Sequence, residues 1–242
     1  LGKGNLRSLV VIAIIGVTAQ MTLKGLIAPA RRAFLQATQI TPTAVSAPAL
    51  LATMGIDEYV ARIAVTLIAS GALLIFAFSD GQFRRAYGQI AAGLAMGLLV
   101  TAGWLATGWL GADDFNPVPV TSLTFVSPIA DTLQYTMLST GLSLSFGIAL
   151  VVGVLSGSLV TAVATGRFKL EGYTSPNHMV RSISGAALMG IGGAMAYGCS
   201  IGQGLTGLST LGMPSFIAVA GILSGAALGI RGAAVVPALA TR

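Results

Sequence analysis

The chain has 242 residues, of which 55% are hydrophobic and only 8% are charged, and its mean hydropathy is +0.87. A soluble globular domain carries roughly 25% charged residues, so this composition excludes an ordinary soluble protein and predicts an all-α membrane protein with several crossings. The formal net charge of +6 is spread over short basic loops, a distribution that favours topology signals over nucleic-acid binding.

Uncharged stretches recur along the chain, and a crossing helix needs about 20 mostly apolar residues. The predicted helices lie, in chain order, at 8–28, 59–78, 88–110, 142–164, 182–197 and 214–230. In this prediction Pro29 ends the first span, and Arg31 and Arg32 follow in a loop. Trp104 and Trp109, near the end of the third span, are typical of the lipid headgroup level. We therefore expect about five to six full transmembrane helices.

Two further stretches are interrupted by proline. The first, 33–56, contains two prolines, and the second, 120–140, contains Pro128 and Asp131. Proline disrupts a helix interior, so both stretches fit broken or re-entrant half-helices better than full crossings. We expect one integral membrane domain over 1–242, with these half-helices around a central path.

The basic residues also predict an orientation. Loops 80–87 and 166–182 are rich in arginine and lysine, so both are expected on the cytoplasmic side. The loop that holds Asp113 and Asp114 then lies on the opposite side.

The most unusual segment lies inside the uncharged stretch 182–230 and contains the only cysteine of the chain, Cys199. Glycine, hydroxyl and amide side chains surround it where a lipid-facing helix would have leucine. Polar, non-helical backbone at membrane depth occurs only where protein surrounds it or where it lines a cavity. We predict that the helix breaks at Gly198 and that the segment lines a substrate path. The predicted path residues are Gly198, Cys199, Ser200, Gly202, Gln203, Gly204, Thr206, Gly207 and Ser209.

This segment has the chemistry of an anion site without a full charge. Glycine lets backbone N–H groups approach a ligand, a following helix adds the partial positive charge of its N-terminus, and hydroxyls add donors. An anion held by dipoles alone binds weakly enough to leave. The thiol of Cys199 favours a solute with exposed sulfur, through weak S–H···S contacts or sulfur exchange.

Several of these features also have a purely structural interpretation. Gly185, Gly190 and Gly193 are expected to serve helix packing, and a lone membrane cysteine is most often an inert apolar residue. His178 lies in a polar loop and is expected to be solvated. Asp131 is a candidate intramembrane acid, although a loop tip would leave it in water. The sequence contains no ATP-binding loop, catalytic triad or metal-binding cluster, so we expect neither an enzyme nor a cofactor.

The segment from Gly185 to Ser209 reads G-A-A-L-M-G-I-G-G-A-M-A-Y-G-C-S-I-G-Q-G-L-T-G-L-S and closely resembles the closing motif of the YeeE/YedE membrane proteins. The opening residues 2–9 and 21–26 resemble the mid-chain helix of that family. The resemblance implies a helical protein of the bacterial inner membrane, in which several cysteines along a narrow path pass thiosulfate by S–H···S contacts.

Only Cys199 matches the cysteines of the family pattern, whose other cysteine motifs lie upstream. The chain also opens on Leu1 rather than methionine, so we expect it to be about the C-terminal two-thirds of a longer protein. The resemblance further implies a soluble sulfurtransferase partner of the TusA type.

The leading functional prediction is a permease for thiosulfate or a related sulfur-containing anion. Cys199 would contact the terminal sulfur, and backbone amides near Gly202 and Gly204 would hold the oxygens. A non-transporting structural subunit of a larger membrane complex is the main alternative. A membrane sulfurtransferase that carries a persulfide on Cys199 is the third.

Overall fold

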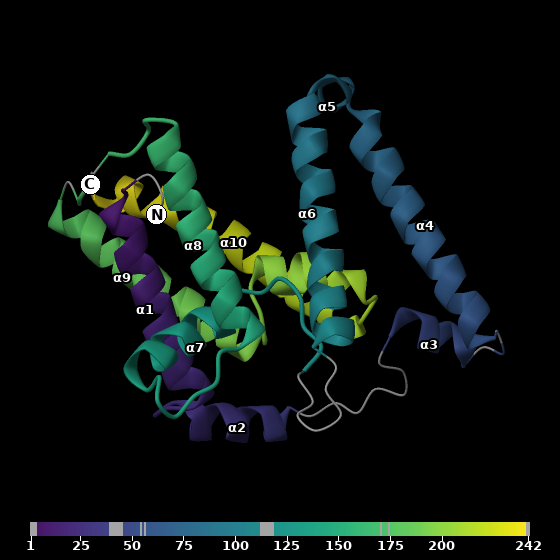
Figure 1. Ribbon diagram of the computed structural model, residues 1–242, viewed down its shortest axis with the longest axis horizontal. Helices are drawn as coiled ribbons and strands as arrows, with labels where there is room; N and C mark the ends of the chain where they lie inside the picture. Colours follow the sequence, from purple (N-terminus) through teal and green to yellow (C-terminus); the bar gives the residue numbers. More distant parts are fainter. Residues whose placement is uncertain are drawn as a thin grey trace. The chain divides into compact units, whose positions relative to one another are not determined.

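The computed structural model is built from α-helices and two short π-helical turns (Figure 1), which confirms the expected all-α class. It describes residues 4–38, 46–53, 55, 57–111, 119–169, 171–173 and 175–240, with side chains as far as residue 231. The predicted loop at Asp113 and Asp114 lies outside the described residues, as does the middle of 33–56. The chain divides into two units, Leu1–Ile40 with Thr107–Gly202 and Thr41–Ala106 with Gln203–Arg242.

The first unit is organised around its first helix. Its helices are α1 (Leu6–Leu23), α2 (Ala28–Ala37), α7 (Val126–Met137), α8 (Phe146–Ala164) and α9 (Pro176–Met195). Helix α1 packs against both α9 and α7, and α8 packs against α7. Side-chain caps define where the long helices begin, because an oxygen of Asn5, Ser145 or Ser175 accepts from a backbone N–H in the first turn of α1, α8 or α9.

Small residues allow α1 and α7 to lie close to α9. A Cβ atom at Gly190 would collide with the side-chain oxygen of Thr18, and a Cβ atom at Gly193 would lie 2.8 Å from Cγ2 of Val126. The expectation that these two glycines serve helix packing is therefore confirmed. Gly185 differs, because a Cβ atom there would meet open space.

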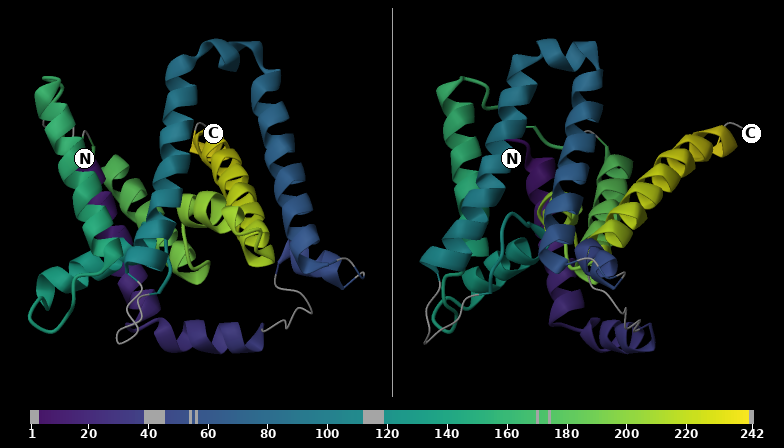
Figure 2. Two further views of the ribbon diagram at one scale, coloured as in Figure 1. Left: turned by 45° about the vertical axis from the view of Figure 1, so that its right-hand side comes forward. Right: turned by 90° about the vertical axis from the view of Figure 1, so that its right-hand side faces the viewer.

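The second unit contains the longest helices of the chain. It consists of α3 (Ala47–Ala52), α4 (Glu58–Ser79), α5 (Gly81–Arg85), α6 (Tyr87–Leu105) and α10 (Met213–Ala240). Helices α4 and α6 run in opposite directions, joined by the short α5 (Figures 1 and 2). The carboxylate of Asp80 accepts from the N–H of Gln82 and so starts α5 within one residue of the end of α4.

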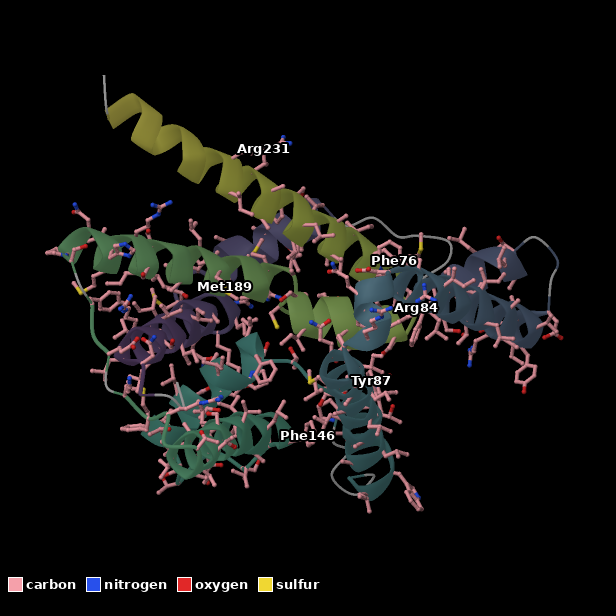
Figure 3. The ribbon with its side chains drawn as sticks, turned by 90° about the horizontal axis from the view of Figure 1, so that it is seen from above. Phe76, Arg84, Tyr87, Phe146, Met189 and Arg231 are labelled. Atoms are coloured by element: carbon pink, nitrogen blue, oxygen red, sulfur yellow. The ribbon has the colours of Figure 1, made fainter. Side chains whose placement is uncertain are left out.

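Among the residues that the structure describes, five helices are long and apolar enough to cross a membrane. They are Leu6–Leu23, Glu58–Ser79, Tyr87–Leu110, Phe146–Ala164 and Met213–Arg231. At most 22% of the apolar window in any of them is buried, and large side chains on these helices, such as Phe76 and Tyr87 (Figure 3), are exposed. Such a surface suits contact with lipid. The protein is thus a polytopic membrane protein, and five of the predicted spans recur in the predicted order.

The first predicted span is too long. Helix α1 ends at Leu23, after which the N–H of Gly25 donates to the carbonyl of Gln20 at 3.0 Å. Pro29 lies in the first turn of α2, where its missing N–H would have no helical partner in any case. It therefore starts a helix rather than ending one, and Arg31 belongs to α2 rather than to a loop.

The proline-interrupted stretch 120–140 forms the expected half-helix. Residues 119–125 form neither helix nor strand, and α7 follows with only 12 residues. At 1.5 Å per residue this helix is about 18 Å long, too short to cross a bilayer. The ends of 33–56 that the structure describes likewise form the last turns of α2 and the six-residue α3.

Candidate functional site

Helix α9 ends in a tight turn directly before Cys199. The N–H of Gly198 donates to the carbonyl of Gly193 at 2.9 Å, and the N–H of Tyr197 donates to that of Ala194 at 3.4 Å. This pair of bonds is the Schellman pattern, which requires a left-handed residue just after the helix. Tyr197 takes that position with φ 54°, where glycine is the usual residue. The predicted break next to Gly198 is confirmed.

A new helix begins immediately after this turn. It covers 200–209, and its middle, η2 (Gly202–Gly207), is π-helical. The sulfur of Cys199 accepts a hydrogen bond from the N–H of Gly202 at 3.5 Å, which is the usual place of a serine or aspartate oxygen at a helix start. The prediction of irregular backbone beyond Cys199 is therefore wrong. Interior N–H and C=O groups need partners, and a helix supplies them.

The thiol lies among small apolar side chains contributed by three helices. The cluster consists of Ala19, Val126, Ala130, Ala194 and Cys199, with Leu23, Phe125 and Ile201 packed against it. Cys199 is only 9% exposed. The three larger side chains are partly buried.

Gly202 lies against the segment that leads into α7. A Cβ atom at Gly202 would be 2.7 Å from Oγ1 of Thr124 and 3.2 Å from its Cβ. The neighbouring Ser122 and Leu123 are buried, at 2% and 6% exposure. The start of the new helix therefore lies so close to this buried segment that a larger residue at 202 would require Thr124 to shift.

The predicted path residues beyond Gly202 belong to the second unit, and most of their polar groups are bonded within the protein. The hydroxyl of Ser215 donates to Oε1 of Gln203 at 2.9 Å, and that of Ser209 donates to the carbonyl of Thr206 at 2.6 Å. Thr206 itself is buried. Ser200, at the start of the helix in the first unit, is exposed.

The two remaining predicted path residues, Gly204 and Gly207, lie inside η2. A Cβ atom at Gly207 would be 2.5 Å from Oγ of Ser215 and 2.8 Å from Oε1 of Gln203, so this glycine makes room for their hydrogen bond. The nearest atom to a Cβ at Gly204 is Cγ2 of Val219 at 3.8 Å, an ordinary contact.

Arg31 is a residue of this region that the sequence did not single out. Its Cζ lies 4.4 Å from the centre of the Tyr197 ring, within the range of a cation–π interaction. Arg31 is 8% exposed, and its Nε and Nη2 atoms are buried with no hydrogen-bond partner among the described residues. An unpaired buried polar group costs about 1–3 kcal/mol. The available signal was the three-residue spacing between Ala28 and Arg31, which puts both on the buried face of α2.

Asp131, the candidate intramembrane acid, is paired in the structure. Its Oδ1 lies 2.9 Å from Nζ of Lys24, and the two side chains are 36% and 57% exposed. Lys24 also donates to Oε1 of Gln134 at 3.2 Å, and the same oxygen accepts from Nε2 of Gln20 at 2.7 Å. This network joins the end of α1 to α7. His178 is exposed, as expected, but it lies in the first turn of α9 rather than in a loop, because this helix begins at Pro176.

Comparison with known proteins assigns the chain to a protein family. A family model described as "Sulphur transport" matches residues 1–228. The thiosulfate transporter TsuA of Escherichia coli (strain K12) is 36% identical over 83 residues, which cover 34% of this chain and 23% of that protein. TsuA of Spirochaeta thermophila is 40% identical over 68 residues, which cover 28% of this chain and 21% of that protein.

The chain thus spans less than a quarter of the length of these two curated relatives. The family model, by contrast, extends over nearly the whole chain, in agreement with the YeeE/YedE resemblance of the Gly-Cys segment. The protein therefore belongs to the sulphur transport family.

Proposed function

We propose that the protein is a permease for thiosulfate or a related sulfur-containing anion in the bacterial cytoplasmic membrane. Family membership, relatives named as thiosulfate transporters and five apolar helices of membrane length support this function. The observation that carries it is the position of Cys199. Its thiol lies where α9 breaks, at the first turn of the next helix, and its sulfur accepts from a backbone N–H.

This geometry suits the two ends of thiosulfate, which has three oxygens and one terminal sulfur on a tetrahedral centre. A thiol is a weak donor that can turn toward the terminal sulfur, and N–H groups at a helix start are donors for the oxygens. A bound anion would take over the N–H of Gly202, which now bonds to the sulfur of Cys199. Gly204 lies inside η2, so the amides of the first turn, 200–202, suit this role better.

The surroundings of the thiol keep such binding weak and transient. The cluster around Cys199 contains small apolar side chains, and the anion would be held there by dipoles and a thiol. Leu23, Phe125 and Ile201 pack against this cluster and are only partly buried. In our proposal they move aside as the anion passes and close again behind it.

The single cysteine favours the alternative function, a structural subunit of a larger membrane complex. Transfer of sulfur-containing anions between successive thiols requires more than one, and Cys199 is the only cysteine in the sequence. A structural subunit beside cysteine-bearing membrane proteins would meet that requirement. Such a subunit would co-purify with them in a fixed ratio, whereas a permease that works alone would run as a single species. A TusA-like soluble sulfurtransferase stays a predicted partner.

The proposed function is tested with purified protein in lipid vesicles and radiolabelled thiosulfate. We expect uptake above that of empty vesicles, inhibited by excess unlabelled thiosulfate. Replacing Cys199 by alanine or by serine should slow it by about tenfold or more, since the thiol contact is lost along the path. Uptake no faster than in empty vesicles would refute the permease. Full activity in both variants would remove the thiol from the mechanism.

A further inference from the structure

The guanidinium of Arg31 is a buried cation without a counter-ion in the described part of the chain. The residue is 8% exposed, and two of its nitrogen atoms, Nε and Nη2, are buried and unpaired. The ion pairs between described residues are Lys24–Asp131 and Arg62–Glu58, and neither includes Arg31. Buried arginine is normally paired, so this side chain has donors to offer to an anion that the chain itself does not supply.

The positions of the two unpaired nitrogen atoms indicate which kind of anion Arg31 can bind. Nε–H and one N–H of Nη2 point in the same direction, along one edge of the guanidinium plane. That edge is the fork that holds two oxygens of a carboxylate or a phosphate-like anion. Cζ of Arg31 lies over the Tyr197 ring, 4.4 Å from its centre, and this contact uses none of the N–H groups of Nε and Nη2 as hydrogen-bond donors.

The fork stands beside the turn that carries the thiol. Tyr197 is separated from Cys199 by one residue, so the two Cα atoms lie at most about 7.6 Å apart. The left-handed conformation of Tyr197, rare for a bulky residue, belongs to the same turn. Both the ring that orients Arg31 and the thiol are therefore set by the end of α9.

We propose that Arg31 binds the oxygen end of the transported anion next to the turn that carries Cys199. The inference rests on the proposed function and adds a full positive charge to a site for which the sequence predicted dipoles alone. The ligand class is a tetrahedral oxyanion with at least two free oxygens. Thiosulfate and sulfate present the same oxygens to the fork, so Arg31 supplies affinity for both, and Cys199 supplies the preference for terminal sulfur.

The test measures binding of thiosulfate and of sulfate to the full chain, purified in a phosphate-free detergent. Arg31→Gln should weaken the binding of both anions by about tenfold or more, because the fork is lost. Arg32→Gln is the matched control. It removes the same charge from the next residue of α2, which is exposed, and should change both dissociation constants by less than about twofold. Cys199→Ala should keep sulfate binding and lose the preference for thiosulfate.

Arg31→Met separates binding from a structural role. Methionine keeps an unbranched apolar side chain and removes the unpaired charge, so the ligand-free Tm should equal or exceed that of the unmodified protein. Added thiosulfate raises the Tm of a protein that binds it, and this rise should disappear in Arg31→Met. A lower ligand-free Tm together with an unchanged rise would overturn the inference and leave Arg31 a structural residue.

Two further outcomes separate this inference from the proposed function and from lipid binding. If the unmodified protein binds sulfate through Arg31 but does not bind thiosulfate, the role of Arg31 is supported and thiosulfate is refuted as the substrate. A phospholipid phosphate has the same chemistry as the proposed ligand. If the purified protein retains anionic phospholipid that Arg31→Met loses, with thiosulfate binding unchanged, the fork binds lipid and the inference is overturned.

Discussion

The two halves of the Gly-Cys segment resemble each other in composition and differ in hydrogen bonding. Residues 196–202 and 203–210 are both rich in glycine and hydroxyl side chains. In the first half, a tyrosine holds a left-handed conformation, a thiol stands at a helix start and a buried guanidinium contacts the turn. In the second half, Ser209 bonds to its own helix and Gln203 accepts a hydrogen bond from Ser215. The unmet donors, rather than the composition, mark the half suited to hold a ligand.

The difference follows from the secondary structure. A serine or threonine within a helix donates its hydroxyl to a carbonyl three or four residues earlier. Ser209 does so to Thr206 at 2.6 Å, and Thr210 does so to Gly207 at 2.7 Å. In the first half, the turn bonds its own N–H groups back to α9, and the unpaired donors beside it are those of Arg31.

The largest change in stability is expected when one glycine from each half is replaced by alanine. Gly202→Ala would place its Cβ 2.7 Å from Oγ1 of Thr124, whereas Gly204→Ala would place its Cβ 3.8 Å from Val219. We expect Gly202→Ala to lower stability by about 1–3 kcal/mol, as overpacking does, and Gly204→Ala to have little effect. Thermal unfolding in detergent measures both. Equal Tm values for the two variants would show that the first half is not more closely packed than the second.

A smaller loss of stability is expected when the hydrogen bond between Ser215 and Gln203 is removed. Ser215→Ala removes the hydroxyl that donates to Gln203 at 2.9 Å, at a cost of about 1 kcal/mol. The control is Ser224→Ala, because the exposed Ser224 bonds only to the carbonyl of Gly221 in its own helix. Thiosulfate uptake by Ser215→Ala should stay within about twofold, since its bond stabilises rather than binds. A tenfold loss of uptake with unchanged Tm would assign the second half a direct role.

The smallest change in stability is expected at Tyr197. Glycine there would relieve the left-handed conformation, worth about 1–2 kcal/mol, and would remove a cation–π contact of about 0.5–2 kcal/mol. The two terms nearly cancel in the Tm, yet Arg31 loses the ring that orients it, so Tyr197→Gly should weaken thiosulfate binding. Tyr197→Phe keeps the ring and should bind as the unmodified protein does. Equal thiosulfate binding by Tyr197→Gly and Tyr197→Phe would show that the ring plays no part in the binding site.

Hydropathy predicted the five long helices because each has a single apolar stretch, and the break next to Gly198 followed from polar residues at membrane depth. The helix at 200–209 could not be predicted in this way, because serine and threonine look the same whether they face a ligand or bond back to a carbonyl. Arg31 was assigned to a loop because Pro29 was interpreted as the end of the first span, whereas it lies in the first turn of α2. Its burial depends on α2 and on the distant Tyr197, and local sequence contains neither contact.

The most direct test compares thiosulfate uptake by Cys199→Ala with uptake by Ser209→Ala, one from each half, in cells that lack other thiosulfate routes. The account predicts a loss of about tenfold or more for Cys199→Ala at unchanged membrane abundance, and a change of less than about twofold for Ser209→Ala. Full uptake by Cys199→Ala together with a large loss in Ser209→Ala would contradict the account and move the substrate path to the second half.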